Sequence, residues 1–215
     1  MRRDDEPINR EQIVRAALEI VDGGGDGALS MRAVASKVDR HVSSLYNHVR
    51  NRAELVDLLS ADIVRSIRVD CFATLDWPAA LSSWSRSYVE AFVAHPNMVQ
   101  ILAVAPVRDL PTLVMYETIL QSLTRQGWPL RDAVHAIRTV EAHAWGSVFD
   151  LVSAEPDLSS YEAEPGLEMV RTALSSLAPA EYGGWASYEA GLDALIAGLE
   201  SRHGALLPRG AGSTR

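Results

Sequence analysis

Apolar residues recur along this chain at steps of three and four residues, and runs that alternate apolar with polar residues are nearly absent. Such spacing places apolar side chains on one face of an α-helix, whereas a half-buried β-strand needs a step of two. Apolar residues make up 47% of the 215 residues, which is ample for a helical core. The pattern therefore predicts an all-α protein.

Composition narrows the class of protein further. The longest apolar runs are far shorter than the roughly 18 residues that cross a bilayer, and the first ten residues, MRRDDEPINR, lack the apolar segment of a signal peptide. The single cysteine, Cys71, excludes an intrachain disulfide and a zinc site built from cysteines. We therefore expect a cytoplasmic protein with no membrane partner.

Capping residues predict where the first helices begin. Asn9 with Gln12, and Asn51 with Glu54, have the spacing of capping boxes, and Ser30 can cap a short helix between them. The glycine-rich stretch DGGGDGAL is expected to end the first helix. The helix that opens after Asn51 is predicted to continue to about residue 68.

A helix-turn-helix is predicted within these helices. The second and third helices are joined by the short sequence DRH, in which Asp39 tolerates the left-handed conformation that a tight turn needs. The third helix begins near Val42 and directs Leu45 and Val49 into a small core. Its polar side chains remain free to meet DNA phosphates and base edges: Ser43, Ser44, Tyr46, Asn47 and His48.

Charge is distributed unevenly and agrees with this prediction. The net charge is −8, yet residues 1–68 hold eleven basic and eleven acidic residues, so the deficit lies in residues 69–215. Within residues 31–52, five basic residues accompany one acidic residue. A basic segment on an acidic body is typical of a small DNA-binding module, although on charge alone a basic patch without function is an equal alternative.

The segment from Leu29 to Leu59, LSMRAVASKVDRHVSSLYNHVRNRAELVDLL, resembles the DNA-binding domain of the TetR family of bacterial regulators. The resemblance places eight side chains where family members contact operator DNA: Arg32, Val42, Ser43, Ser44, Tyr46, Asn47, His48 and Arg52. It implies that Tyr46 and Arg52 bind phosphates, while Ser43, Ser44 and Asn47 read bases.

Two positions depart from the pattern of the family. Asp39 stands where the turn usually has glycine, and Val42 stands where a polar base-reading residue is common. Val42 either packs into the core or contacts a thymine methyl group. For His48, a contact with the carbonyl groups at the end of the helix is the alternative to a phosphate contact.

The remainder of the chain is predicted to be helical. One helix follows Asp76 and ends before Pro96, and others cover residues 110–126, 130–153, 166–177 and 182–202, with a loop at 154–165. The helix at 110–126 is expected to bury one face, formed by Leu113, Tyr116, Leu120 and Leu123.

A ligand pocket is predicted from the aromatic and polar residues of this body. His135, Arg138, Trp145 and Phe149 share one helix face, which is either a pocket wall or an ordinary aromatic face with an exposed polar end. Further residues can line the same cavity: Trp84, Tyr88, Phe92, Met98, Met115 and Tyr116.

No enzymatic motif accompanies this pocket. The sequence HAIRTVEAHAW does not have the spacing of a zinc-binding H-E-x-x-H helix, and neither a phosphate-binding glycine loop nor G-x-S-x-G occurs. We therefore expect a binding protein with no catalytic residue, metal or cofactor.

The last helix has a stripe of small residues at helical spacing: Gly184, Ser187, Gly191, Ala194 and Gly198. Glycine within a helix costs about 1 kcal/mol relative to alanine, so close helix packing is expected there. The stripe predicts either a two-fold interface with a second copy or close packing inside one chain. The family resemblance favours a homodimer, in which the last helix and the helix at 130–153 form a four-helix bundle with the partner.

Together these features predict three segments: a helix-turn-helix domain with a linker helix (1–68), a helical ligand-binding and dimerisation domain (69–204) and a flexible tail (205–215). The expected function is that of a dimeric regulator, a repressor, which binds a palindromic double-stranded operator and is released by a small-molecule effector. An activator with the same fold, or a small-molecule-binding protein whose DNA binding is weakened or lost, remains an alternative.

Overall fold

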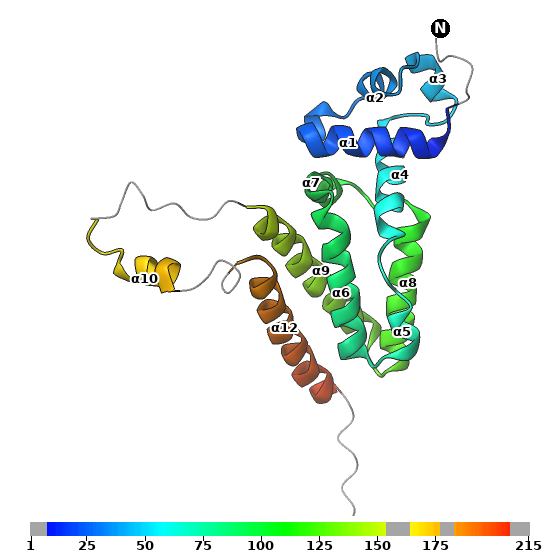
Figure 1. Cartoon of the computed structure of the whole chain (residues 1–215). Coiled ribbons are helices and arrows are strands. Elements are labelled where there is room, and N and C mark those ends of the chain that lie inside the picture. Colours follow the sequence, from blue (N-terminus) through cyan, green and yellow to red (C-terminus); the bar gives the residue numbers. More distant parts are fainter. Residues whose placement is uncertain (1–7, 154–163, 177–182, 207–215) are drawn as a thin grey trace, which may run out of the picture.

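The computed structural model describes residues 8–153, 164–176 and 183–206, and each regular element in these ranges is a helix (Figure 1). The all-α prediction is therefore confirmed. Among the described helices, none has both the length and the hydropathy that crossing a bilayer requires.

Helix α1 (Arg10–Ala28) begins as its capping box predicts. The Asn9 side chain accepts a hydrogen bond from the backbone N–H of Gln12, and the Gln12 side chain accepts one from Asn9. The prediction for its end is only partly right. The helix passes through Gly23 and Gly24, breaks at Gly25, where φ is 66°, and adds one turn to Ala28. Glycine has no Cβ, so Gly25 adopts this conformation without strain.

The next three helices complete the N-terminal module, which lies above the body in Figure 1. Ser30 caps α2 (Met31–Lys37) by accepting a hydrogen bond from Ala33, and Asp39 has a φ of 53° in the turn before α3 (Val42–Tyr46), as predicted. Helix α4 (Arg52–Val64) follows Asn51 and is shorter than expected, because it ends at Val64 rather than near residue 68.

The body consists of six further helices that extend below this module: α5 (Cys71–Thr74), α6 (Trp77–Val93), α7 (Pro96–Val104), α8 (Leu110–Arg125), α9 (Leu130–Val152) and α12 (Gly184–Leu206) (Figure 1). Helices α6 and α12 pack along α9. Large side chains that are fully buried in the body include Trp84, Phe92, Leu123 and Tyr188.

Two predictions for the C-terminal part need comment. Helix α10 (Glu168–Ser176) forms within the expected range, lies apart from the body in Figure 1 and buries none of its residues. The predicted tail begins too early, because α12 continues to Leu206; the rest of the tail, 207–215, lies outside the described residues. The loop predicted at 154–165 also lies outside them, apart from its last two residues.

The buried face of α8 differs from the predicted one. Leu113 is exposed, and Tyr116 and Leu120 are only half-buried, whereas Met115 and Ile119 are buried. Both sets have helical spacing, so the sequence alone does not distinguish them. The contacts of α8 with α4, α5 and α9 decide which arc is covered.

Two contacts join the N-terminal module to the body. Helix α1 packs on α7, where the Asn97 side chain donates to the carbonyl oxygen of Val21 at 2.9 Å and His95 lies 2.9 Å from an Asp22 carboxylate oxygen. Helix α4 leaves the module and runs down against α6, α7 and α8. The module and the body therefore share α4 as a common element.

Candidate functional site

The residues predicted to contact DNA surround the short helix α3 and its neighbours. Arg32 on α2 and Ser43, Tyr46 and Asn47 are exposed, while Ser44 and His48 are half-buried. The ring of Tyr46 is notable because 51% of this large side chain is exposed. The segment therefore presents polar groups outward while Leu45 and Val49 are buried, as predicted.

Helix α3 is shorter than the sequence indicated. Asn47 is its C-terminal capping residue and His48 follows in a turn, where the N–H groups of His48 and Val49 both donate to the carbonyl oxygen of Leu45 at 2.9 Å. Asn47 and His48, both predicted to contact DNA, consequently lie beyond the helix rather than on it. Val42 is half-buried against the core, which agrees with the packing alternative for this residue.

Arg52 has partners within the chain. Its guanidinium group forms an ion pair with Asp26, and its Nε donates to the carbonyl oxygen of Leu29 at 3.2 Å. The side chain thus joins the start of α4 to the last turn of α1 and to the residue that follows it. Its role in the fold is structural, whether or not it also meets a phosphate.

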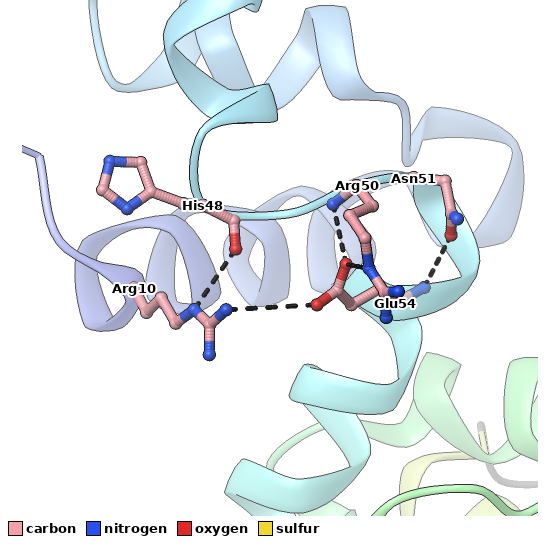
Figure 2. Close-up of polar contacts among 5 residues, drawn as sticks. All are labelled: Arg10, His48, Arg50, Asn51 and Glu54. Atoms are coloured by element: carbon pink, nitrogen blue, oxygen red, sulfur yellow. Dashed lines mark hydrogen bonds and ion pairs between the residues drawn. The ribbon is translucent and has the colours of Figure 1, made fainter.

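Glu54 connects α3, α4 and α1 through a network that the sequence did not predict (Figure 2). Its Oε2 accepts hydrogen bonds from the backbone N–H of Arg50 at 2.7 Å and from the Nε of Arg50 at 2.9 Å. Arg10 on α1 lies 4.0 Å from the other oxygen, and its Nε donates to the carbonyl oxygen of His48 at 3.2 Å.

This network changes the second predicted capping box. Asn51 accepts from the N–H of Glu54 at 2.9 Å, as expected, but the Glu54 carboxylate binds Arg50 instead of returning to Asn51. The backbone and side-chain hydrogen bonds of Arg50 lower the pKa of Glu54, so the carboxylate is charged near neutral pH. In Figure 2 only the carbonyl group of His48 joins the network, and its imidazole points away from it.

A cavity of about 180 Å³ lies in the body between α4, α6, α8, α9 and the end of α7. Six of the ten predicted ligand-binding residues line it: Tyr88, Phe92, Met115, Tyr116, Arg138 and Trp145. Trp145 is thus the aromatic residue that α9 contributes to the cavity, and its indole N–H reaches the hydroxyl oxygen of Tyr88 on α6 at 2.7 Å.

The other four predicted residues lie outside this cavity. Trp84 and Met98 are fully buried, and the indole N–H of Trp84 faces the sulfur of Met115 at 3.4 Å. His135 is exposed on the outer part of α9, and Phe149 is half-buried against the core. For these residues the core and surface alternatives describe the structure better than a pocket wall does.

Glu141 is the polar centre of the cavity, although its side chain is only 2% exposed. Its Oε1 accepts hydrogen bonds from the hydroxyl groups of Tyr88, at 3.1 Å, and Tyr116. Arg138 donates to Oε2 at 3.0 Å, and the indole N–H of Trp145 donates to the hydroxyl oxygen of Tyr88 at 2.7 Å. One buried carboxylate that was not predicted therefore holds three of the predicted residues directly, and it holds Trp145 through Tyr88.

Burial and the Glu141 charge both raise the pKa of Tyr88 and the pKa of Tyr116 well above the usual value. The two phenols therefore remain protonated near neutral pH and act as hydrogen-bond donors to Glu141.

The cavity also includes polar residues from α4 and the start of α8 that sequence reasoning missed: Asp57, Ser60, Asp109 and Thr112. Ser60 donates to Oδ2 of Asp109 at 3.0 Å, and Oδ1 of Asp109 accepts from the N–H of Thr112 at 2.9 Å, which caps α8. The available signal was a polar pair, Asp57 and Ser60, one turn apart in the mostly apolar segment ELVDLLSADIV.

The small residues of α12 have different surroundings. A Cβ built on Gly191 would lie 2.4 Å from Cε1 of His143 on α9, and one on Gly184 would lie 3.3 Å from Leu151. These two positions are explained by packing within the chain. Ser187, Ala194 and Gly198 are exposed and are the members of the stripe that a second copy can reach.

Comparison with known proteins places the chain in context. The family profile described as "Tetracyclin repressor-like, C-terminal domain" matches residues 73–203. The chain is 28% identical over 214 residues to the tetracycline repressor protein class D of Escherichia coli, with 93% of both chains covered.

Solved structures share the fold. Apo ActR from Streptomyces coelicolor superposes with a TM-score of 0.72 at 24% identity, covering 94% of this chain and 99% of that one. The complex of ActR with actinorhodin gives a TM-score of 0.70 at 24% identity, covering 93% and 100%.

Proposed function

The chain belongs to the tetracycline-repressor-like (TetR) family, and from this premise we propose that it is a ligand-responsive transcriptional repressor. It binds a palindromic operator as a homodimer and leaves the operator when a small molecule occupies the cavity. Related proteins support this function: the class D relative is a tetracycline repressor, and ActR binds actinorhodin. These compounds are named for the relatives, and they do not identify the effector of this chain.

The observation that carries the proposal is the position of α4. Its first turn holds the α3 segment (residues 42–50) through the contact of Glu54 with Arg50. Its later turns supply Val56, Asp57, Ser60 and Val64 to the cavity. A ligand that displaces α4 consequently moves the face predicted to meet DNA. The coupling between two such sites is typically about 1–3 kcal/mol.

The proposal divides the chain into two functional parts. Residues 1–68 form the DNA-binding part, with α4 as its link, and residues 69–204 form the effector-binding and dimerisation part. The eight predicted DNA contacts remain part of the proposal, with Tyr46, Ser43 and Asn47 the most exposed of the α3 segment.

Fluorescence anisotropy with labelled DNA from upstream of the gene tests the proposal. The expected result is tight binding that resists competitor DNA and weakens with salt, with a slope of about 0.9 per neutralised phosphate. Binding that is weak and independent of salt, by a folded dimer, would favour a binding protein that no longer reads DNA.

The proposed dimer uses the exposed part of the small-residue stripe on α12. Ala194→Arg places a long charged side chain in that interface and is expected to produce monomers in sedimentation velocity. Glu200→Arg is the matched control, because Glu200 is also exposed but lies about 120° away from Ala194 around the helix. Equal behaviour of the two variants would contradict this interface.

A further inference from the structure

The cavity contains more acidic than basic groups. Asp57, Asp109 and Glu141 line it, together with a single guanidinium group, that of Arg138. Arg138 lies 3.0 Å from Glu141 and so neutralises that carboxylate. The remaining two carboxylates have no cation among the residues that line the cavity.

These two carboxylates face the same part of the cavity. Asp57 and Ser60 are one helical turn apart on α4, and Ser60 donates to Asp109 at 3.0 Å. Burial raises the pKa of Asp57; Arg108 opposes this rise and the nearby Asp109 charge adds to it. Within the described part of the chain, the Asp57 carboxylate accepts no hydrogen bond. A positive charge placed here would meet two carboxylates that the protein leaves partly uncompensated.

Thr112 provides a second, independent observation. It lines the cavity one turn after Asp109, is 5% exposed, and its hydroxyl group has no hydrogen-bond partner among the described residues. Buried hydroxyl groups in native proteins nearly always have a partner, and leaving one unpaired is unfavourable. The N–H of Thr112 binds Asp109, so the unpaired hydroxyl belongs to the residue that holds this carboxylate.

Aromatic residues also line the cavity. Tyr88 and Phe92 have ring centroids 4.8 Å apart, and Trp145 is held in place by its hydrogen bond to Tyr88. Aromatic faces attract both planar apolar groups and cations. The cavity thus joins an aromatic wall to an acidic end.

From this arrangement we infer that the effector is a small aromatic molecule with a positively charged nitrogen. Its ring packs against Tyr88, Phe92 and Trp145, and its ammonium group lies between Asp57 and Asp109 within reach of the Thr112 hydroxyl. That this molecule acts as an effector rests on the proposed function, whereas the preference for a cationic aromatic molecule rests on the cavity alone.

Isothermal titration calorimetry of the full-length protein with two probes tests the preference. The probes, 2-(1-naphthyl)ethylamine and 1-naphthylacetate, share a ring system and carry opposite charges at neutral pH. We expect the amine to bind at least about 10-fold more tightly, as a charge-assisted hydrogen bond is worth that much.

Variants locate the binding site. Asp57→Asn and Asp109→Asn are each expected to weaken binding of the amine about 10-fold, and asparagine at 109 preserves the cap of α8. Thr112→Val keeps the shape of the side chain but removes its hydroxyl group, and it is also expected to weaken binding of the amine. Asp62→Asn is the matched control, because Asp62 lies exposed on α4 outside this cavity.

Three outcomes would overturn the inference: naphthylacetate binds as tightly as the amine, the amine is insensitive to both aspartate variants, or neither probe binds at millimolar concentration. The operator anisotropy experiment separates this result from the proposed function. Operator binding with a preference for the anion refutes the inference alone, while a preference for the amine without operator binding refutes the repressor alone.

Discussion

The face around α3 and the cavity in the body both contain polar side chains, yet those side chains are held in different ways. On α3, Tyr46 is half-exposed, and its side chain forms no hydrogen bond or ion pair with another residue of the described ranges, so its conformation is free to change when it contacts DNA. In the cavity, Glu141 is buried and binds Tyr88, Tyr116 and Arg138. Substitutions on the face around α3 should therefore change DNA binding, whereas substitutions in the cavity should change the stability of the fold as well as ligand binding.

The largest effect is expected for Glu141→Ala. Without this carboxylate the hydroxyl groups of Tyr88 and Tyr116 lose a common acceptor, and the truncated side chain leaves a void. The free energy of unfolding should fall by about 2–4 kcal/mol, as measured by urea denaturation followed by circular dichroism. Glu117→Ala, on the exposed side of α8, is the control and should change stability by less than about 0.5 kcal/mol. Equal losses in the two variants would contradict a structural role for Glu141.

The same contrast explains how much the sequence could predict. The sequence predicted Asn9 and Ser30 as helix caps and Asp39 as a turn residue, because caps and tight turns depend on a few adjacent residues. The α3 segment was found for the same reason, since its polar residues are consecutive. Contacts between distant residues were not accessible in this way.

The cavity shows the limit most clearly. Asp57, Ser60 and Asp109 meet because α4 packs against the start of α8, and the two residues joined by the Ser60 hydrogen bond are 49 positions apart. Leu113 was assigned to the core for a related reason: its spacing fits a helix face, but tertiary packing covers Met115 and Ile119 instead. Helical periodicity identifies a helix and leaves the choice of buried arc to the neighbouring elements.

On the DNA face, Tyr46 and Arg52 should behave differently although both were predicted to bind phosphates. Tyr46→Ala should weaken operator binding by about 1–2 kcal/mol per subunit without changing the melting temperature or the salt slope, because a phenol is neutral. Arg52→Ala should lower the melting temperature, since it removes the ties to Asp26 and Leu29. Anisotropy titrations at several salt concentrations, with thermal unfolding in parallel, measure both effects.

The salt slope decides what Arg52 does on DNA. If its guanidinium also binds a phosphate, Arg52→Ala reduces the slope by about 0.9 per subunit; an unchanged slope would make the residue purely structural. A fall in melting temperature for Tyr46→Ala would contradict the view that this side chain is free of the fold.

Ser60→Ala tests the element that the two regions share. The change removes the buried hydrogen bond between α4 and Asp109, while Asp109 keeps the N–H of Thr112. The free energy of unfolding should fall by about 1 kcal/mol. Combined with Asp109→Asn, it should show an interaction energy of about 0.5–1.5 kcal/mol in a double-mutant cycle. Ser66→Ala is the control, because that hydroxyl bonds only to Ile63 in its own turn; additive effects of Ser60 and Asp109 would argue against the link.

The smallest effect is expected for Glu54→Gln, which keeps an acceptor for the N–H of Arg50 but removes the charge that attracts Arg50 and Arg10. Stability near pH 7 should fall by about 0.5–1 kcal/mol. Because the folded-state pKa of Glu54 is lowered, its contribution is complete above the unfolded value of about 4.3 and is lost as the pH falls through the folded value. Thermal unfolding should therefore show the variant and the natural protein converging below about pH 4. A gap between Glu54→Gln and the natural protein that stays constant with pH would mean that shape, not charge, is what Glu54 supplies to the α3 segment.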